Sequence, residues 1–178
     1  MRMKKIAFFI LCLSLLAFKN SFAEGTAGEY VSQGLAYRNQ GDLDRAIAVF
    51  TQAIEADPNY SDAYLRRGIT YRNKGKFEEA ISDFTKASEL DLRNPEIYYN
   101  RGNAYAAENN FDLAVADLSK SLELNPNDGE VYFNRANAYY SEQKYDKAWE
   151  DVRKAQGLGY KVNTRFLNKL STASGKDQ

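Results

Sequence analysis

The chain has 178 residues, a length that is enough for one domain of ordinary size. Its formal net charge is zero and it has a single cysteine. It has no histidine, so the commonest general base and a common transition-metal ligand are missing. A charge-balanced chain gives no reason to expect a nucleic-acid partner, because phosphate binding needs a basic surface.

Residues 1–23 have the pattern of a signal peptide that is removed from the mature protein. The basic start MRMKK is followed by an apolar run at 6–18, and Ser21 and Ala23 have the small size that a signal peptidase reads. The apolar run is too short for a membrane span, which needs about 20 residues. We therefore predict cleavage before Glu24 and export. The periplasm is the favoured location, and secretion is the alternative to it. The alternative is an uncleaved membrane anchor.

Cys12 lies inside the apolar run and does not fit a lipoprotein signal, because Leu11 precedes it where a small residue is required. Cleavage would remove this cysteine together with four of the 24 basic residues, namely Arg2, Lys4, Lys5 and Lys19. The mature chain would then carry 20 basic and 24 acidic residues and have a net charge of about −4. No disulfide could form within it.

After a short segment at 24–26, the chain repeats one pattern four times at a fixed period. Five columns of similar residues recur in this register: Tyr30, Tyr64, Tyr98 and Tyr132; Gly34, Gly68, Gly102 and Ala136; Tyr37, Tyr71, Tyr105 and Tyr139; Ala46, Ala80, Ala114 and Ala148; and Phe50, Phe84, Leu118 and Val152. The columns define four units, at 27–60, 61–94, 95–128 and 129–162.

Each unit has the pattern of two helices. In the third unit, Tyr98, Gly102 and Tyr105 share one face of a first helix, and apolar residues from Phe111 to Leu122 mark a second. The small columns let the two helices approach closely. One such hairpin cannot bury its own apolar face, so several must stack.

A short turn is expected between the two helices of every unit. Gly41, Gly75, Asn109 and Gln143 stand at its equivalent position. Glycine is natural at a left-handed helix stop and asparagine tolerates it, whereas Gln143 predicts that the last turn is built differently.

These columns resemble the tetratricopeptide repeat family over residues 27–162. The signature of aromatic, small, Tyr, Ala, large apolar, Ala and Pro is matched in the first unit by Tyr30, Gly34, Tyr37, Ala46, Phe50, Ala53 and Pro58. The fourth unit departs from it at Ala136 and in Gly157-Leu158-Gly159, as expected of a terminal unit. The resemblance implies an all-α, right-handed solenoid of four helix hairpins, with the first helices lining a concave groove.

The segment NTRFLNKLS at 163–171 is predicted to form a capping helix over the fourth hairpin. Asn163 or Thr164 can cap its start, and its apolar stripe consists of Phe166, Leu167 and Leu170. The alternative is a free amphipathic tail. We expect residues 172–178 to be disordered.

Residues outside the packing columns of the first helices share a face turned about 100° from the tyrosine stripe. We predict that this face binds a protein or an extended peptide through Leu65, Arg66, Ile69, Tyr99, Asn100, Asn103, Phe133, Asn134, Asn137 and Tyr140. The first half of the groove is apolar and rimmed by Arg38, Arg66 and Arg72, and the second half offers aromatics beside asparagines. Asparagine offers donors and an acceptor, so it can pair with a peptide backbone. The alternative is a solvated, unused helix face.

The sequence carries no phosphate-binding loop and no nucleophile elbow, so we predict no catalytic residue, no cofactor and no metal. It favours an exported, non-catalytic adaptor or assembly factor, without a small-molecule substrate and not embedded in the membrane once mature. The alternative is a structural protein whose open array ends mediate homo-oligomerisation.

Family members that bind the acidic C-termini of heat-shock chaperones use a clamp of Lys, Asn and Arg. Leu65 and Ile69 stand where that clamp needs Lys and Asn, so we do not predict that role.

Overall fold

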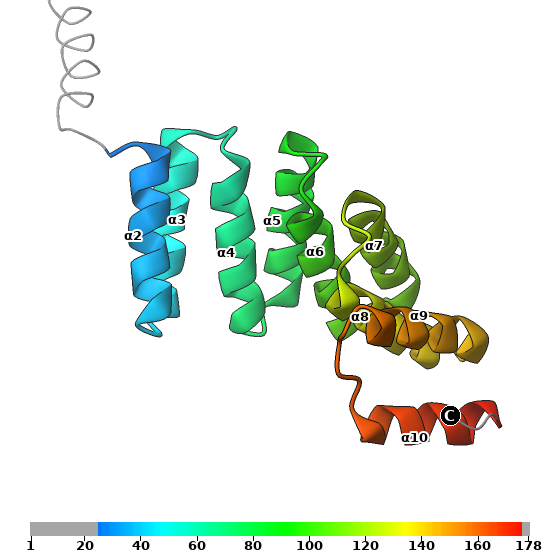
Figure 1. Ribbon diagram of the computed structural model, residues 1–178. Coiled ribbons are helices and arrows are strands. Elements are labelled where there is room, and N and C mark those ends of the chain that lie inside the picture. Colours follow the sequence, from blue (N-terminus) through cyan, green and yellow to red (C-terminus); the bar gives the residue numbers. More distant parts are fainter. Residues whose placement is uncertain (1–24, 176–178) are drawn as a thin grey trace, which may run out of the picture.

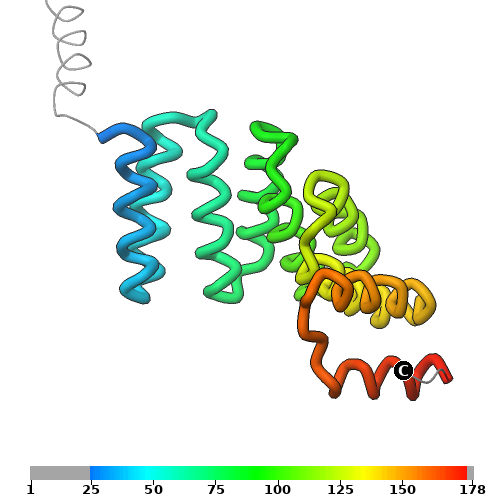
Figure 2. The backbone as a smooth tube through the Cα atoms, in the orientation of Figure 1, coloured from blue at the N-terminus to red at the C-terminus, as the bar shows by residue number. Residues whose placement is uncertain are grey.

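The computed structural model describes residues 25–175, within which nine helices follow one another and no strand occurs. Eight of them form four consecutive hairpins: α2 (Ala27–Asn39) with α3 (Leu43–Ala56), α4 (Ser61–Asn73) with α5 (Phe77–Leu90), α6 (Pro95–Ala107) with α7 (Phe111–Leu124), and α8 (Gly129–Ser141) with α9 (Tyr145–Gly157). The ninth helix is α10 (Thr164–Ser174). Figure 1 shows the hairpins stacked in chain order, and the tube in Figure 2 shows their axes turning progressively along the array. The predicted all-α solenoid is confirmed.

The expected signal segment, 1–23, lies outside the described residues. Within 25–175, no helix has both the length and the apolar character needed to cross a membrane.

The four hairpin turns share one backbone conformation. Gly41, Gly75, Asn109 and Gln143 all have positive φ, at 81°, 73°, 61° and 60° respectively. The backbone N–H after Gln143 donates to Tyr139 O at 2.8 Å, as the N–H after Gly41 donates to Tyr37 O at 3.0 Å. The expectation of a different last turn is therefore wrong. A left-handed glutamine costs roughly 1–2 kcal/mol, which the packing of the hairpin outweighs.

Close helix approach explains the small column. A Cβ on Gly68 would lie 2.7 Å from the Phe84 ring, and one on Gly102 would lie 2.9 Å from Leu118. In the fourth hairpin the facing residue is the smaller Val152, and there Ala136 is accommodated with both residues fully buried. The exception to the glycine column therefore follows from the size of its partner.

A repeated ion-pair network joins each of the last three hairpins to the one before it. Arg101 on α6 donates from Nε and NH2 to both oxygens of Asp117 on α7, at 2.7 and 2.9 Å. Its NH1 donates to Ser88 Oγ and Thr85 Oγ1 on α5, at 3.0 and 3.3 Å. The hydrogen bonds to Asp117 raise the pKa of the Arg101 guanidinium. We call this arrangement the arginine clip.

The clip recurs at the equivalent positions of the second and fourth hairpins. Arg67 binds Asp83 with two bonds of 2.8 Å and Thr51 Oγ1 at 3.0 Å. Arg135 binds Asp151 at 2.7 and 2.8 Å and Ser119 Oγ at 2.9 Å. In the first hairpin, Gln33 and Val49 occupy these positions, and no earlier hairpin stands before them among the described residues.

The tyrosine columns pack on the clips. The Arg67 guanidinium lies 5.9 Å from the ring centroids of Tyr64 and Tyr71, and that of Arg135 lies 5.6 and 5.8 Å from those of Tyr132 and Tyr139. These distances allow cation–π attraction. The tyrosines therefore shield the ion pairs from water as well as filling space between helices.

Helix α10 covers the fourth hairpin. Phe166, Leu167 and Leu170 are buried in one cluster with Trp149 and Val152 of α9. Asn163 caps the helix by accepting the Phe166 N–H at 2.8 Å. The helix extends to Ser174, whose Oγ accepts a 3.0 Å hydrogen bond from Trp149 Nε1. The expected disordered tail at 172–178 is therefore wrong for residues 172–174, because the tryptophan on α9 anchors the last turn.

We predict that breaking one clip destabilises the array strongly. Asp117→Val leaves the mostly buried Arg101 without its partner and should lower the free energy of unfolding by about 3–5 kcal/mol. The double change Arg101→Gln and Asp117→Val, which copies the first hairpin, should cost less than the single change. Urea unfolding followed by circular dichroism measures both. A loss below about 1 kcal/mol for Asp117→Val, the level of an ordinary surface ion pair, would contradict a structural role for the clip.

Candidate functional site

Two of the predicted groove residues belong to the core. Leu65 is fully buried beside Phe84 and Ile97. Asn100 is 3% exposed, and its Nδ2 donates to the Glu96 carbonyl at 2.7 Å. Neither faces the groove, so both assignments are corrected. Each first helix packs on the second helix of its own hairpin and also on the neighbouring hairpins. The buried part of its surface is therefore wider than the face that carries the tyrosines.

Arg66 and Ile69 lie on α4, partly buried. Arg66 Nε lies 2.9 Å from Asp62 Oδ1 without the alignment of a hydrogen bond, and its NH1 donates to Glu96 Oε1 at 3.0 Å. The second contact bridges α4 and α6. Ile69 packs on the core cluster that contains Leu65. Arg66 therefore holds two neighbouring first helices together while remaining at the groove surface.

A polar network joins α6 to α8. Tyr99 Oη donates to Glu130 Oε1 at 2.8 Å. Asn134 Nδ2 is shared between Asn103 Oδ1 at 3.1 Å and Tyr99 Oη at 3.4 Å. Burial, followed by the hydrogen bond to Glu130, raises the pKa of Tyr99 to about 12, so the phenol stays neutral and donates. We call these four side chains the Tyr–Asn network.

Asn137 extends the row of amides along α8. Its Nδ2 donates to the Phe133 carbonyl in the same helix at 2.9 Å. Within residues 25–175, the side-chain oxygens of Asn137 and Asn134 accept no hydrogen bond from another side chain or backbone group. They can therefore accept one from the backbone of a partner.

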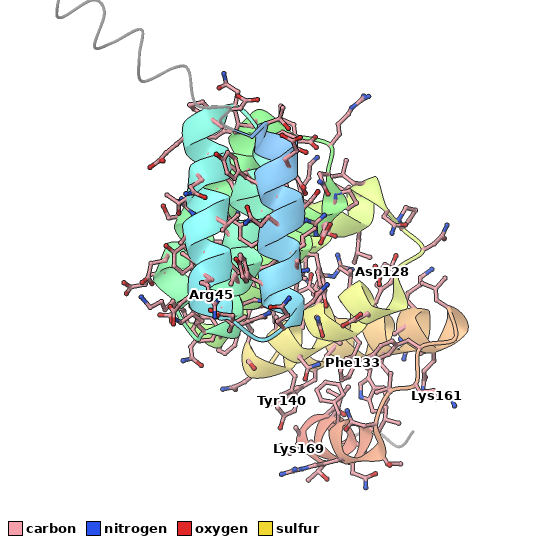
Figure 3. All side chains as sticks on the ribbon, turned by 90° about the vertical axis from the view of Figure 1, so that its left-hand side faces the viewer. Arg45, Asp128, Phe133, Tyr140, Lys161 and Lys169 are labelled. Carbon is pink, nitrogen blue, oxygen red and sulfur yellow. The ribbon has the colours of Figure 1, made fainter. Side chains whose placement is uncertain are left out.

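The two aromatic residues of α8 that were predicted to bind a partner, Phe133 and Tyr140, pack on other aromatic side chains of the chain. Phe133 stacks on Tyr160, with ring centroids 5.2 Å apart, and meets the edge of Phe166 at 5.3 Å. Tyr140 contacts Phe166 at 5.7 Å and Tyr145 at 5.8 Å. Figure 3 shows Phe133 and Tyr140 extending from α8 toward α10. The assignment of Phe133 as an open apolar anchor is corrected, because Tyr160 already occupies one face of its ring.

Two hollows adjoin predicted residues. A cavity of about 660 Å³ lies between Tyr140 and the polar face of α10, lined also by Arg165, Asn168 and Lys169. A smaller one of about 210 Å³ lies beside Tyr99, between Glu96 and Asp128. Within the described range, no group of three or more acidic, histidine or cysteine residues is placed to hold a metal ion.

Sequence reasoning missed two groups that shape the site. Glu130, which fixes the Tyr99 hydroxyl, could have been noticed because Glu96 is its equivalent in the preceding repeat and bridges to Arg66 in a similar way. Tyr160 could not have been identified from the sequence, because the connection before α10 departs from the repeat pattern. The structure brings together Tyr99, Asn103 and Asn134, and it packs Phe133 and Tyr140 on other aromatic side chains.

Comparison with protein-family models places the repeats in a known class. A model described as TPR repeat matches residues 34–74 and 68–107. Two models described as tetratricopeptide repeat match residues 95–128 and 118–150. A comparison with curated protein sequences found no match.

Several solved structures are similar to this chain in fold. A crystal structure of MamA superposes with a TM-score of 0.75 at 26% identity, covering 84% of this chain and 82% of that one. MamA from Desulfovibrio magneticus RS-1 gives 0.71 at 22% identity, over 76% of this chain and 77% of that one, and shows the fold alone. The first TPR domain of Spaghetti (RPAP3), bound to the HSP90 peptide SRMEEVD, gives 0.64 at 29% identity, over 66% of this chain and 96% of that one.

We predict that α10 stabilises the array through its aromatic contact with α8. Phe166→Ala should lower the free energy of unfolding by about 3 kcal/mol or more, because it opens a cavity against Phe133 and Tyr140. Lys169→Ala, an exposed change on the same helix, is the matched control and should change it by less than about 0.5 kcal/mol. Thermal unfolding measures both, and equal melting curves would show that α10 is not a cap.

Proposed function

The chain belongs to the tetratricopeptide repeat family, and on that premise we propose that it is a non-catalytic adaptor or assembly factor. It would hold an extended segment of a partner protein in the groove formed by its first helices. The RPAP3 domain, a related array, is bound to a peptide, which supports this class of partner.

The observation that carries the proposal is the Tyr–Asn network. Tyr99, Asn103 and Asn134 are partly buried polar residues on consecutive first helices, held at defined distances by hydrogen bonds. Fixed amides lose little conformational entropy when a partner binds, so they suit recognition of a peptide backbone. An unused, solvated helix face would not need such ordering.

The corrected surface is smaller than the sequence suggested. It excludes Leu65 and Asn100, which are core residues, and Phe133, which is covered. The remaining contacts that we propose are Arg66, Ile69, Tyr99, Asn103, Asn134, Asn137 and the partly exposed Tyr140. The proposed contact surface would therefore run over α4, α6 and α8.

Self-association through apolar ends has little support. Within residues 25–175, the large apolar side chains with substantial exposure are Leu92, Leu113 and Leu158. They lie in the loop after α5, on α7 and after α9, and none of them belongs to the first hairpin, α2–α3. The array end at α9 is also covered by α10.

The groove can be tested with paired amide variants. Asn134→Ala with Asn137→Ala should weaken binding of the partner captured by the mature chain from an envelope extract, by about 1 kcal/mol for each hydrogen bond lost. Gln52→Ala with Gln156→Ala, on exposed positions of α3 and α9, is the matched control and should bind normally. Isothermal titration with the purified partner measures affinity, and circular dichroism confirms folding. Unchanged affinity in the first pair would move the site away from the groove.

We propose further that the protein acts outside the cytoplasm, because residues 1–23 have the sequence pattern of a cleaved signal. The protein recovered from a periplasmic extract should begin at Glu24. Intact-mass spectrometry decides this directly. A retained N-terminus, or a membrane-bound pool that resists salt extraction, would contradict export with cleavage.

A further inference from the structure

Within residues 25–175, two arginines on the groove side of the array form no ion pair. Among the described residues, seven Arg and Lys side chains are partly buried: Arg38, Arg66, Arg67, Arg72, Lys74, Arg101 and Arg135. Five of them form ion pairs with Asp or Glu. Arg38 and Arg72 form none with any residue in 25–175, and all the other unpaired cations in that range are exposed.

Arg38 and Arg72 occupy equivalent positions in the first two repeats, near the ends of α2 and α4. Burial and then repulsion from Arg66 lower the pKa of Arg38, with Glu96 and Asp62 offsetting this only in part. The charge of Arg72 lowers the pKa of Tyr99, against the larger opposing effects of burial and Glu130. Both guanidinium groups therefore lie within electrostatic reach of the proposed groove.

The acidic side chains nearby are already engaged. Asp62 and Glu96 both contact Arg66, and Glu130 accepts the hydroxyl of Tyr99. Withdrawing a cation from water without a paired anion is unfavourable, and a carboxylate from a partner would offset that cost. A guanidinium pairs with a carboxylate through two parallel hydrogen bonds, which makes arginine well suited to this.

We propose that Arg38 and Arg72 bind two acidic side chains of one extended partner segment, at positions i and i+3. This rests on the proposed function and names the chemistry of its partner. The segment would place its carboxylates over α2 and α4 and its backbone along the Tyr–Asn network.

The spacing follows from the geometry of both chains. Helices α2 and α4 are neighbours, and packed helices lie about 8–10 Å apart. An extended polyproline-type segment rises about 3.1 Å per residue and completes a turn every third residue, so residues i and i+3 share a face about 9 Å apart. A free C-terminal carboxylate supplies a single anion, whereas the two arginines lie on separate helices. Two acidic side chains of one segment would therefore match them better than a chain terminus.

Selection from short random peptides tests the inference. The peptides are displayed with their C-termini fused to the carrier, so that no free terminal carboxylate is present, and are selected on the mature chain. We expect enrichment of Asp or Glu pairs at i and i+3. Synthetic copies of the selected peptides should bind equally well with a C-terminal amide and with a free acid. A pool without acidic pairs, or affinity that depends on the free acid, would overturn the inference.

Matched variants then locate the contact. Arg38→Gln and Arg72→Gln should each weaken the selected acidic peptide by about tenfold or more, and should reduce the salt dependence of binding. Arg93→Gln, an exposed arginine without an ion pair in 25–175, is the control and should bind normally.

The two proposals fail in different ways. If the selected peptides lack acidic pairs but still lose affinity with Asn134→Ala and Asn137→Ala, the groove stands and the acidic partner is wrong. If the selected peptides bind equally to the arginine and asparagine variants, both proposals are wrong.

Discussion

The arginine clip is the interaction on which the arrangement of the hairpins depends. Each clip spans three helices, because one guanidinium binds the Asp of its own hairpin and a hydroxyl of the hairpin before it. A hydrophobic contact between helices allows sliding, whereas a two-bond ion pair with fixed geometry does not. The clips therefore set the register between hairpins, and the tyrosine columns close over them.

The residues that hold the hairpins together are different from those on the proposed binding surface. Positions that carry the clip, the tyrosines and the small residues are repeated almost unchanged, while the groove-side positions vary from Arg66 and Ile69 to Asn134 and Asn137 along the array. Arg66–Glu96 and the Tyr–Asn network also bridge neighbouring first helices, so contacts within the chain hold the surface that we propose for binding. Such pre-organisation reduces the entropic cost of binding.

The repeated columns predicted the hairpins well, because each column repeats the same helix contacts. The columns gave wrong predictions where the burial of a side chain depends on a neighbour that is not part of the repeat. Leu65 and Asn100 were misplaced because the buried arc of a first helix includes contacts with adjacent hairpins. Phe133 was taken as open because nothing in the repeat predicts that Tyr160 stacks on it. The clip residues form visible columns, but the pairing of an arginine on one helix with an aspartate on the next becomes evident only in three dimensions.

We propose that the first helices of the hairpins, and not the second helices or α10, hold the partner. The amide chemical shifts of residues 24–178 can be followed during titration with the captured partner segment. We expect the largest changes in chemical shift on α2, α4 and α6 and on the side of α8 that carries Asn134 and Asn137. Changes concentrated on α3, α5, α7 and α9, or on α10, would contradict it.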